Sequence, residues 1–166
     1  MWRNKMSDNK ACSCCGDTVE LAINNKDINK CPICNQFGKT VKNTTVKHLV
    51  KAEFSDSVGG MNYLICMNED CDTVYYSKNK EIHFSQKQVK VPIWFKKDAD
   101  PKYACYCSEV TIDQVKEAVR DKGARKMKDV LAITGAMKNS NCEVKNPLGV
   151  CCHERIQQGI DEALAE

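Results

Sequence analysis

The chain lacks the features of a membrane-spanning or secreted protein. Its 166 residues contain no run approaching the roughly 18 apolar residues that predict a membrane span. Its first residues include no apolar run of about seven or more followed by a small-residue cleavage site, so they do not resemble a secretory signal. We therefore expect a cytoplasmic protein in a reducing compartment, with no insertion into a membrane.

The chain also lacks the common motifs of hydrolases and nucleotide-binding enzymes. It has no GxSxG elbow, HExxH helix, GxxxxGK[ST] loop or GxGxxG turn. Its 25 basic and 22 acidic residues nearly balance, and they form no long basic stripe interleaved with aromatic residues. These absences argue against hydrolysis, nucleotide chemistry and nucleic-acid binding. We expect stoichiometric transfer of electrons or metal rather than enzymatic turnover.

Twelve cysteines stand out against these absences. A short chain uses so many cysteines either as disulfides in an oxidising compartment or as metal ligands in a reducing one. Because the N-terminus does not resemble a secretory signal, we interpret the cysteines as metal ligands.

The second half of the chain contains a cysteine set typical of a [2Fe-2S] cluster. Cys105 and Cys107 enclose one residue in KYACYCSEVT, and Cys142 follows ahead of the adjacent Cys151 and Cys152. Such a cluster is held by four thiolates. Free cysteines rarely gather at loop positions without a metal-binding or redox role. We therefore predict a cluster bound by the first three cysteines and one of the last two.

The helix expected after the last cysteines decides between them. Ile156, Ile160 and Leu164 recur every four positions and predict a helix that begins just after Cys152. A thiolate in the first turn of a helix is favoured by free N–H groups and the helix dipole, by about 0.3 to 1 kcal/mol when exposed. We therefore predict Cys152 as the fourth cluster ligand, with Cys151 as the alternative.

A second set of four cysteines lies in the first half of the chain. Cys31 and Cys34 form CPIC, and Cys66 and Cys71 form CMNEDC. A CxxC turn presents two sulfurs, and a second pair completes a tetrahedral site that suits zinc and contributes to folding. Because the gap in the second pair is wider than in a standard zinc ribbon, a rubredoxin-like iron site is the alternative.

Composition and periodicity divide the chain into three parts. Residues 1–24 form a polar tail that contains cysteines, and residues 25–98 contain the short β-type runs NYLIC, DTVYYS, EIHFS and VKVPIWF. Residues 99–166 follow the joint DADP and have helical periodicity. The expected fold class is α+β, with a small antiparallel β zinc-binding domain followed by a small helical [2Fe-2S] domain.

Local signals predict three helices in the last part. Thr111 and Gln114 form a capping box that begins the first helix, and Gly123 should end it. A second helix is expected over residues 124–133, ended by Gly135, and the third follows Cys152.

The three histidines are not expected to bind metal. His48 and His83 should be hydrogen-bonded or exposed, as histidines on a sheet or helix face usually are. His153 directly follows the predicted ligand Cys152, where an imidazole can tune a cluster's potential without replacing a thiolate.

Taken together, these motifs resemble the N-terminal region of the CopZ-type copper chaperones. The resemblance covers about residues 30–160 and rests on CPIC, GKTVKNTTVKHLV, CMNEDCDTVYYS, CYCSEVT and ITGAMKNSNCEVKNPLGVCCHERI. The second half alone is similar to bacterioferritin-associated ferredoxin. The resemblance implies zinc at the first cysteine set, a [2Fe-2S] cluster at the second, and a one-electron centre able to reduce Cu(II) to Cu(I).

One part of the family pattern has no counterpart in this sequence, namely the βαββαβ module with an MxCxxC copper-binding loop. Cu(I) needs only two or three thiolates, and four cysteines are not assigned to zinc or the cluster: Cys12, Cys14, Cys15 and Cys151. The expected partner is a copper-transporting ATPase or a separate copper-binding domain protein. The sequence does not identify the electron donor.

The predicted function is therefore that of a redox-active copper chaperone, which reduces Cu(II) to Cu(I) and binds Cu(I) for handover. The first alternative is a ferredoxin-like [2Fe-2S] electron carrier for another metalloprotein, with no copper role. The second is a zinc-stabilised interaction or nucleic-acid-binding module.

Overall fold

The structure is a computed structural model that describes residues 27–166. The predicted tail over residues 1–24, with Cys12, Cys14 and Cys15, lies outside the described residues. None of the helices in the described part is long and apolar enough to cross a membrane.

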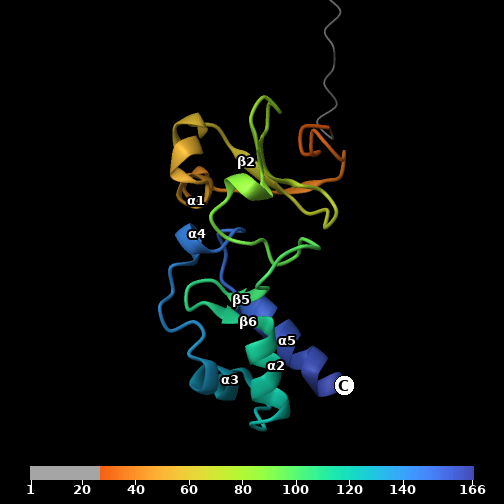
Figure 1. Cartoon of the computed structure of the whole chain (residues 1–166), viewed down its shortest axis with the longest axis vertical. Coiled ribbons are helices and arrows are strands. Elements are labelled where there is room, and N and C mark those ends of the chain that lie inside the picture. The colour runs from red at the N-terminus through yellow and green to blue at the C-terminus, as the bar shows by residue number, and fades with distance from the viewer. Residues whose placement is uncertain (1–26) are drawn as a thin grey trace, which may run out of the picture.

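An antiparallel sheet forms the centre of the first half of the molecule (Figure 1). Its strands follow one another in the order β1-β2-β3-β4, so each pairs with its neighbour along the chain. Every residue of β2 and β3 is buried, which places these two strands in the core. The strands are β1 (Gly38–Val41), β2 (Tyr63–Cys66), β3 (Thr73–Ser77) and β4 (His83–Ser85).

The sequence prediction for this half is right for three of the β-type runs and wrong for the fourth. The residues of VKVPIWF form no strand, and Val89 makes only an isolated bridge to Val50. Pro92 in this run has no N–H to donate to a ladder. The prediction also missed β1 and the helical elements α1 (Asn43–Leu49), η1 (Ala52–Ser57) and η2 (Gln86–Gln88).

The second half contains a short hairpin and four helices. The hairpin pairs β5 (Tyr103–Cys105) with β6 (Val110–Thr111). The predicted capping box is confirmed, since Thr111 accepts a hydrogen bond from the backbone N–H of Gln114 and caps α2. Gly135 ends α3 in the left-handed region with φ of 74°, as predicted. The helices are α2 (Ile112–Arg120), α3 (Met127–Thr134), α4 (Cys142–Lys145) and α5 (His153–Ala165).

The core of this half lies between α2, α3 and α5. Val115, Val130, Ile156 and Ile160 are at most 1% exposed within it. The predicted stripe on the last helix is wrong at its end, because Leu164 is 42% exposed and Ala163 is buried instead. The α+β fold class expected from the sequence is confirmed.

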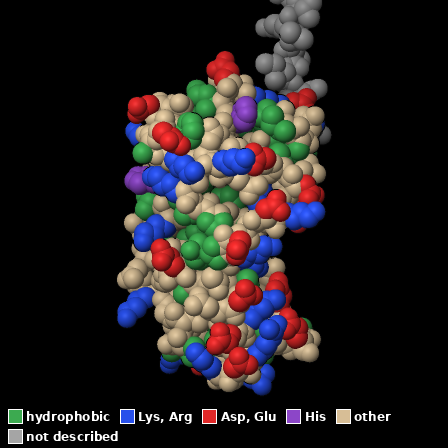
Figure 2. Space-filling view, in the orientation of Figure 1, with side chains coloured by type: hydrophobic (Ala, Val, Ile, Leu, Met, Phe, Trp, Pro, Cys, Tyr) green, Lys and Arg blue, Asp and Glu red, His purple; other side chains and the backbone are tan. Residues whose placement is uncertain are grey.

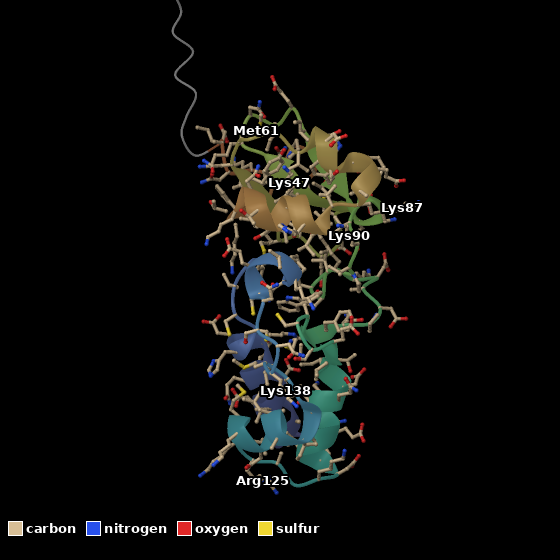
Figure 3. All side chains as sticks on the ribbon, turned by 90° about the vertical axis from the view of Figure 1, so that its left-hand side faces the viewer. Lys47, Met61, Lys87, Lys90, Arg125 and Lys138 are labelled. Carbon is tan, nitrogen blue, oxygen red and sulfur yellow. The ribbon has the colours of Figure 1, made fainter. Side chains whose placement is uncertain are left out.

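The two halves of the chain meet through the segment over residues 142–149. In both Figure 1 and Figure 3, α4 lies directly beside α1 of the first half. The hydroxyl of the fully buried Thr45 donates to the carbonyl of Glu143 at 2.6 Å, and the hydroxyl of Tyr75 donates to the carbonyl of Pro147 at 2.7 Å. The segment that begins with Cys142 is therefore fixed by residues of α1 and β3.

Charged side chains of both signs are mixed on the face of the molecule seen in Figure 2. Figure 2 shows basic and acidic groups interspersed on one face, without a large area of either sign. This agrees with the near balance of charges in the sequence and with the absence of a basic stripe.

Candidate metal centres

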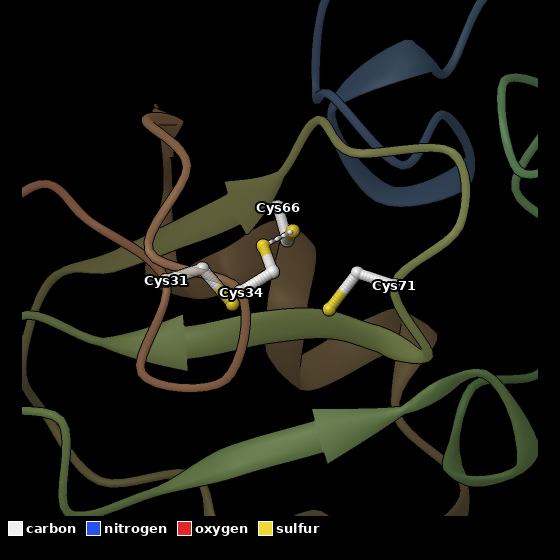
Figure 4. Close-up of side chains that lie close together, drawn as sticks. All are labelled: Cys31, Cys34, Cys66 and Cys71. Carbon is white, nitrogen blue, oxygen red and sulfur yellow. Dashed lines mark hydrogen bonds between the residues drawn. The ribbon is translucent and has the colours of Figure 1, made fainter.

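Two loops at one end of the sheet bring the first cysteine set together (Figure 4). In the first loop the N–H of Cys31 donates to the carbonyl of Gln36 at 2.9 Å, and the N–H of Asn35 donates to the carbonyl of Cys31 at 3.0 Å. Asn35 adopts φ of 58°, in the left-handed region that Asn tolerates well. This tight turn presents the sulfurs of Cys31 and Cys34 on one side of the loop.

The second loop joins β2 to β3 and supplies the other two cysteines. Cys66 is the last residue of β2, and Cys71 lies two residues before β3. The loop between them turns at Asn68, whose side-chain oxygen accepts the N–H of Asp70 at 3.1 Å. The wide spacing seen in the sequence therefore corresponds to one compact turn between adjacent strands.

The four sulfurs of this set form a compact group. All of them lie within 4.8 Å of one another, and the sulfurs of Cys34 and Cys66 are 3.6 Å apart. Zinc bound at about 2.3 Å from each of four thiolates needs sulfurs roughly 3.8 Å apart. The geometry fits a tetrahedral ion bound only by sulfur.

Burial sets the electrostatics of this set. It raises the pKa of the thiols of Cys66 and Cys71, because a charged sulfur is poorly solvated there. Burial also raises the pKa of Cys34, but hydrogen bonds from the Gln36 backbone, from Asn68 and from neighbouring thiols outweigh it and bring the pKa to about 7. Thiolates in such a place are stabilised by a bound cation.

The second cysteine set is built around the hairpin of β5 and β6. Cys105 ends β5, Cys107 lies in the turn, Cys142 begins α4 and Cys152 is the N-cap residue of α5. The sulfurs form two pairs. Those of Cys107 and Cys142 are 3.6 Å apart, and the thiol of Cys152 is hydrogen-bonded to Cys105. Each pair thus takes one sulfur from the CxC motif and one from a helix start.

Two backbone N–H groups point at the sulfurs of the CxC motif. The N–H of Met137 donates to Cys105 at 3.4 Å, and the N–H of Asn141 donates to Cys107 at 3.2 Å. Both donors lie between α3 and α4, in the segment that follows Gly135. Such N–H groups stabilise anionic sulfur and are among the contacts that set the potential of a cluster.

The Cys105 and Cys152 thiols shift each other's pKa in opposite directions. The hydrogen bond from Cys152, together with the N–H groups of Met137 and Ser108, lowers the pKa of Cys105 to about 5 against the effect of burial. The same hydrogen bond and burial raise the pKa of Cys152. Burial and the neighbouring Cys107 raise the pKa of Cys142 to about 11. The arrangement of two close sulfur pairs fits the two-iron geometry, in which each iron takes two thiolates.

The two adjacent cysteines occupy different environments. Cys152 is 3% exposed and paired with Cys105, whereas Cys151 is exposed. Cys151 and His153 line a groove of about 490 Å³ between β1 and the start of α5. The sequence did not predict this groove, because it joins residues more than 100 positions apart. The structure thus brings the sulfurs of the predicted set together in two pairs, while the neighbouring Cys151 is exposed.

The three histidines lie at the surface of the molecule. His48, His83 and His153 are all exposed, and the ring of His48 contacts the carbonyl of Thr44 at 2.8 Å. His153 lies on the groove beside Cys151 rather than in the buried sulfur group.

Comparison with known proteins adds independent findings. Residues 28–90 match the family zf_CopZ, described as a zinc binding domain. The chain is similar to the copper chaperone CopZ of Archaeoglobus fulgidus, with 33% identity over 129 residues, 78% of this chain. This alignment spans 60% of the length of that relative.

A solved structure is also similar to this one. It is the X-ray structure of the Archaeoglobus fulgidus CopZ N-terminal domain, which matches with a TM-score of 0.65 and 32% sequence identity. The match covers 78% of this chain and 95% of that domain. The similarity therefore extends over both halves of the described chain and over nearly the whole of the solved domain.

Proposed function

Since this chain belongs to the family of the CopZ N-terminal region and contains its zinc-binding domain, we propose that it is a redox-active copper chaperone. It reduces Cu(II) to Cu(I) and binds Cu(I) for handover in the cytoplasm. The copper ion is the cargo, and the two cysteine sets are the resident metal sites.

The first cysteine set is assigned to zinc. Its four sulfurs lie within 4.8 Å of one another, and the family matched by residues 28–90 is described as zinc-binding. Zinc has no redox chemistry, so its role is to stabilise the fold. The ligands are Cys31, Cys34, Cys66 and Cys71.

The paired second set is the observation that carries the redox part of the proposal. Two close sulfur pairs, one at 3.6 Å and the other hydrogen-bonded, suit a [2Fe-2S] cluster held by Cys105, Cys107, Cys142 and Cys152. Bound there, the cluster supplies one electron at a time. The protein residues hold the four sulfurs, point two N–H groups at them and exclude most solvent.

Cys151 is the proposed point of copper contact in the described part of the chain. Its thiol is exposed on the groove, and its backbone is joined to that of the ligand Cys152. A soft thiolate suits Cu(I), and a neighbouring imidazole such as His153 suits either copper oxidation state. Cys12, Cys14 and Cys15 are proposed as further copper thiolates outside the described residues. The acceptor is a copper-transporting ATPase or a separate copper-binding domain protein.

One observation favours the alternative of an electron carrier without a copper role. Within residues 27–166, Cys151 is the one exposed cysteine, so few soft ligands are accessible there. A single accessible thiolate binds Cu(I) less well than two or three. In the alternative, the groove beside Cys152 receives a partner protein instead of a metal ion.

Mixing the reduced protein with Cu(II) without oxygen separates these functions. The chaperone predicts that each reduced cluster yields about one Cu(I), detected with a Cu(I)-specific chelator, as the visible spectrum returns to the oxidised form. A variant that combines four substitutions should still transfer the electron but should no longer retain Cu(I). The substitutions are Cys12→Ser, Cys14→Ser, Cys15→Ser and Cys151→Ser. A cluster that Cu(II) does not oxidise, or retention unaffected by the serines, would contradict copper handling.

A further inference from the structure

Lys96 is a lysine without any solvent exposure. Its side chain is 0% exposed, and its ammonium donates to the carbonyl of Asn68 at 2.7 Å and to that of Thr73 at 2.9 Å. These two carbonyls lie on either side of Cys71, in the loop and strand that supply the second half of the zinc set. The ammonium therefore ties the turn of the ligand loop to the start of β3.

The ammonium has no carboxylate partner among the described residues. The ion pairs found there involve other lysines and Arg120, while the ring of Phe95 lies 5.7 Å from the Lys96 nitrogen. Burying an unpaired ion costs several kcal/mol in effective terms. Lysines are almost never fully buried unless they are paired with an opposite charge.

The neighbouring cysteine set can supply the negative charge that the Lys96 ammonium lacks. Four thiolates and a divalent ion leave a net charge of about −2, and three of these sulfurs are buried. The Lys96 ammonium donates to two carbonyls, those of Asn68 and Thr73, which lie two residues beyond Cys66 and two residues beyond Cys71. The lysine is thus held against the backbone beside two of the ligand cysteines.

We propose that Lys96 is the internal counter-cation of the four-cysteine site and the positioning residue for its Cys66–Cys71 loop. Its charge offsets part of the excess negative charge of the metal-loaded site, and its two hydrogen bonds hold the loop in the metal-binding conformation. Two functions in one side chain explain why a lysine is placed where an apolar residue would cost less to bury.

Lys97, which contacts the same loop, provides a matched control. Its backbone N–H donates to the carbonyl of Glu69 at 3.1 Å, while its side chain is 72% exposed and pairs with Asp70 at 3.5 Å. Replacing the Lys97 side chain keeps the backbone contact and removes one surface charge from the same region. Exposed pairs of this kind contribute little to stability.

The test is a zinc competition titration of the wild-type chain and of Lys96→Met, Lys96→Arg and Lys97→Met. We expect Lys96→Met to weaken zinc binding by about 10- to 100-fold, as loss of contacts around metal ligands does. Lys96→Arg should recover most of the affinity because it keeps the charge, and Lys97→Met should bind as the wild type does. If Lys96→Met does not fold in excess zinc, the zinc titration of Lys96→Arg is used instead. Folding of Lys96→Arg with near wild-type affinity then supports the proposal.

Several outcomes would overturn the proposal. They are wild-type affinity in Lys96→Met, equal losses in Lys96→Met and Lys96→Arg, and failure of both variants to fold in excess zinc. The proposal rests on the assignment of zinc to this set. The wild-type titration tests that assignment separately from the role of the lysine. Wild-type protein that binds no zinc refutes the zinc site itself, whereas normal wild-type binding with an unchanged Lys96→Met refutes the role of the lysine.

A second readout tests the charge directly. With iron in place of zinc, the site has one more negative charge in the ferrous than in the ferric state. Removing a nearby positive charge therefore disfavours the ferrous state, so Lys96→Met should lower the reduction potential of the iron-substituted site and Lys96→Arg should not. A potential that is the same in Lys96→Met and the wild type would show that the lysine acts only through packing.

Discussion

Replacing Tyr75 with phenylalanine tests how the two halves of the molecule are held together. The Tyr75 hydroxyl donates to the carbonyl of Pro147 at 2.7 Å, and both residues are buried. The substitution removes the donor and leaves the carbonyl without that partner, away from water. Pro147 belongs to the segment between Cys142 and Cys152, so the effect reaches the predicted cluster ligands.

The size of the effect follows from the burial of both groups. Leaving a buried acceptor unsatisfied costs about 1 to 3 kcal/mol. For a chain of this length, each kcal/mol lowers the melting temperature by roughly 2 to 4 °C. We therefore expect Tyr75→Phe to lower the free energy of unfolding by about 2 kcal/mol in urea denaturation, with a matching fall in a thermal melt.

Tyr103 supplies the control for this substitution. It is half-buried against Tyr106, with 5.2 Å between ring centroids, and its hydroxyl makes no hydrogen bond to another residue in the range 27–166. Tyr103→Phe should stay within about 0.5 kcal/mol of the wild type. If Tyr75→Phe were as stable as Tyr103→Phe, the bond to Pro147 would not hold the segment, and the reasoning would be refuted.

A double variant measures whether the segment docks as a unit. Thr45→Val removes the hydroxyl that donates to the carbonyl of Glu143 at 2.6 Å. Because Thr45 and Tyr75 hold the same segment, we expect the combined loss to differ from the sum of the single losses by about 0.5 kcal/mol or more. Simple additivity would show that the two hydrogen bonds act independently.

The remaining predictions concern the zinc set and its surroundings. Removing zinc with a chelator should expose residues 28–90 to proteolysis and reduce their β-type circular dichroism, because the bound metal contributes to folding; an unchanged fold would contradict a structural role. Burial raises the pKa of Cys66 and Cys71, so zinc must displace their protons and its affinity should rise with pH and fall on acidification. Calorimetry in buffers of different ionisation enthalpy should detect proton release, and its absence would show that these thiols are not ligands. Gly38→Ala should destabilise the fold by about 1 to 3 kcal/mol in denaturant titration, because a Cβ would overlap the Tyr76 hydroxyl and the Ile65 carbonyl; Gly60→Ala, with open space around it, is the control.

Local sequence signals predicted the parts of the fold that depend on neighbouring residues. The capping box of Thr111 and Gln114 fixes the start of α2 because both partners lie within one turn. The left-handed Gly135 ends α3 for a similarly local reason. The periodicity of Ile156 and Ile160 also predicted the buried face of α5. This prediction failed only at Leu164, which is 42% exposed near the end of the helix.

Features that depend on contacts between distant segments could not be predicted. The polar sequence of β1 gives no alternating pattern, and that strand forms because β2 offers a partner. The docking of α4 on α1 joins Thr45 of the first half to Glu143 of the second half, 98 residues further along the chain. A lysine is normally exposed, so nothing in the sequence around Lys96 indicates burial.

The two cysteine sets could be predicted only in part, because they depend on both local turns and contacts between distant segments. The cysteine spacing indicated the first set, whose four sulfurs lie within 4.8 Å of one another, because turns of fixed length bring them to one place. The division of the second set into the pairs Cys105 with Cys152 and Cys107 with Cys142 required the hairpin and the helix starts to be placed in space.

Iron and sulfide content of Cys151→Ser and Cys152→Ser, purified without oxygen, tests the cluster assignment most directly. We expect about two iron and two sulfide per chain, with the visible absorption of a [2Fe-2S] cluster, in the wild type and in Cys151→Ser. We expect most of the iron and sulfide to be lost in Cys152→Ser. A cluster that survives in Cys152→Ser and is lost in Cys151→Ser would contradict the ligand set, and wild-type protein without iron or sulfide would contradict the redox function itself.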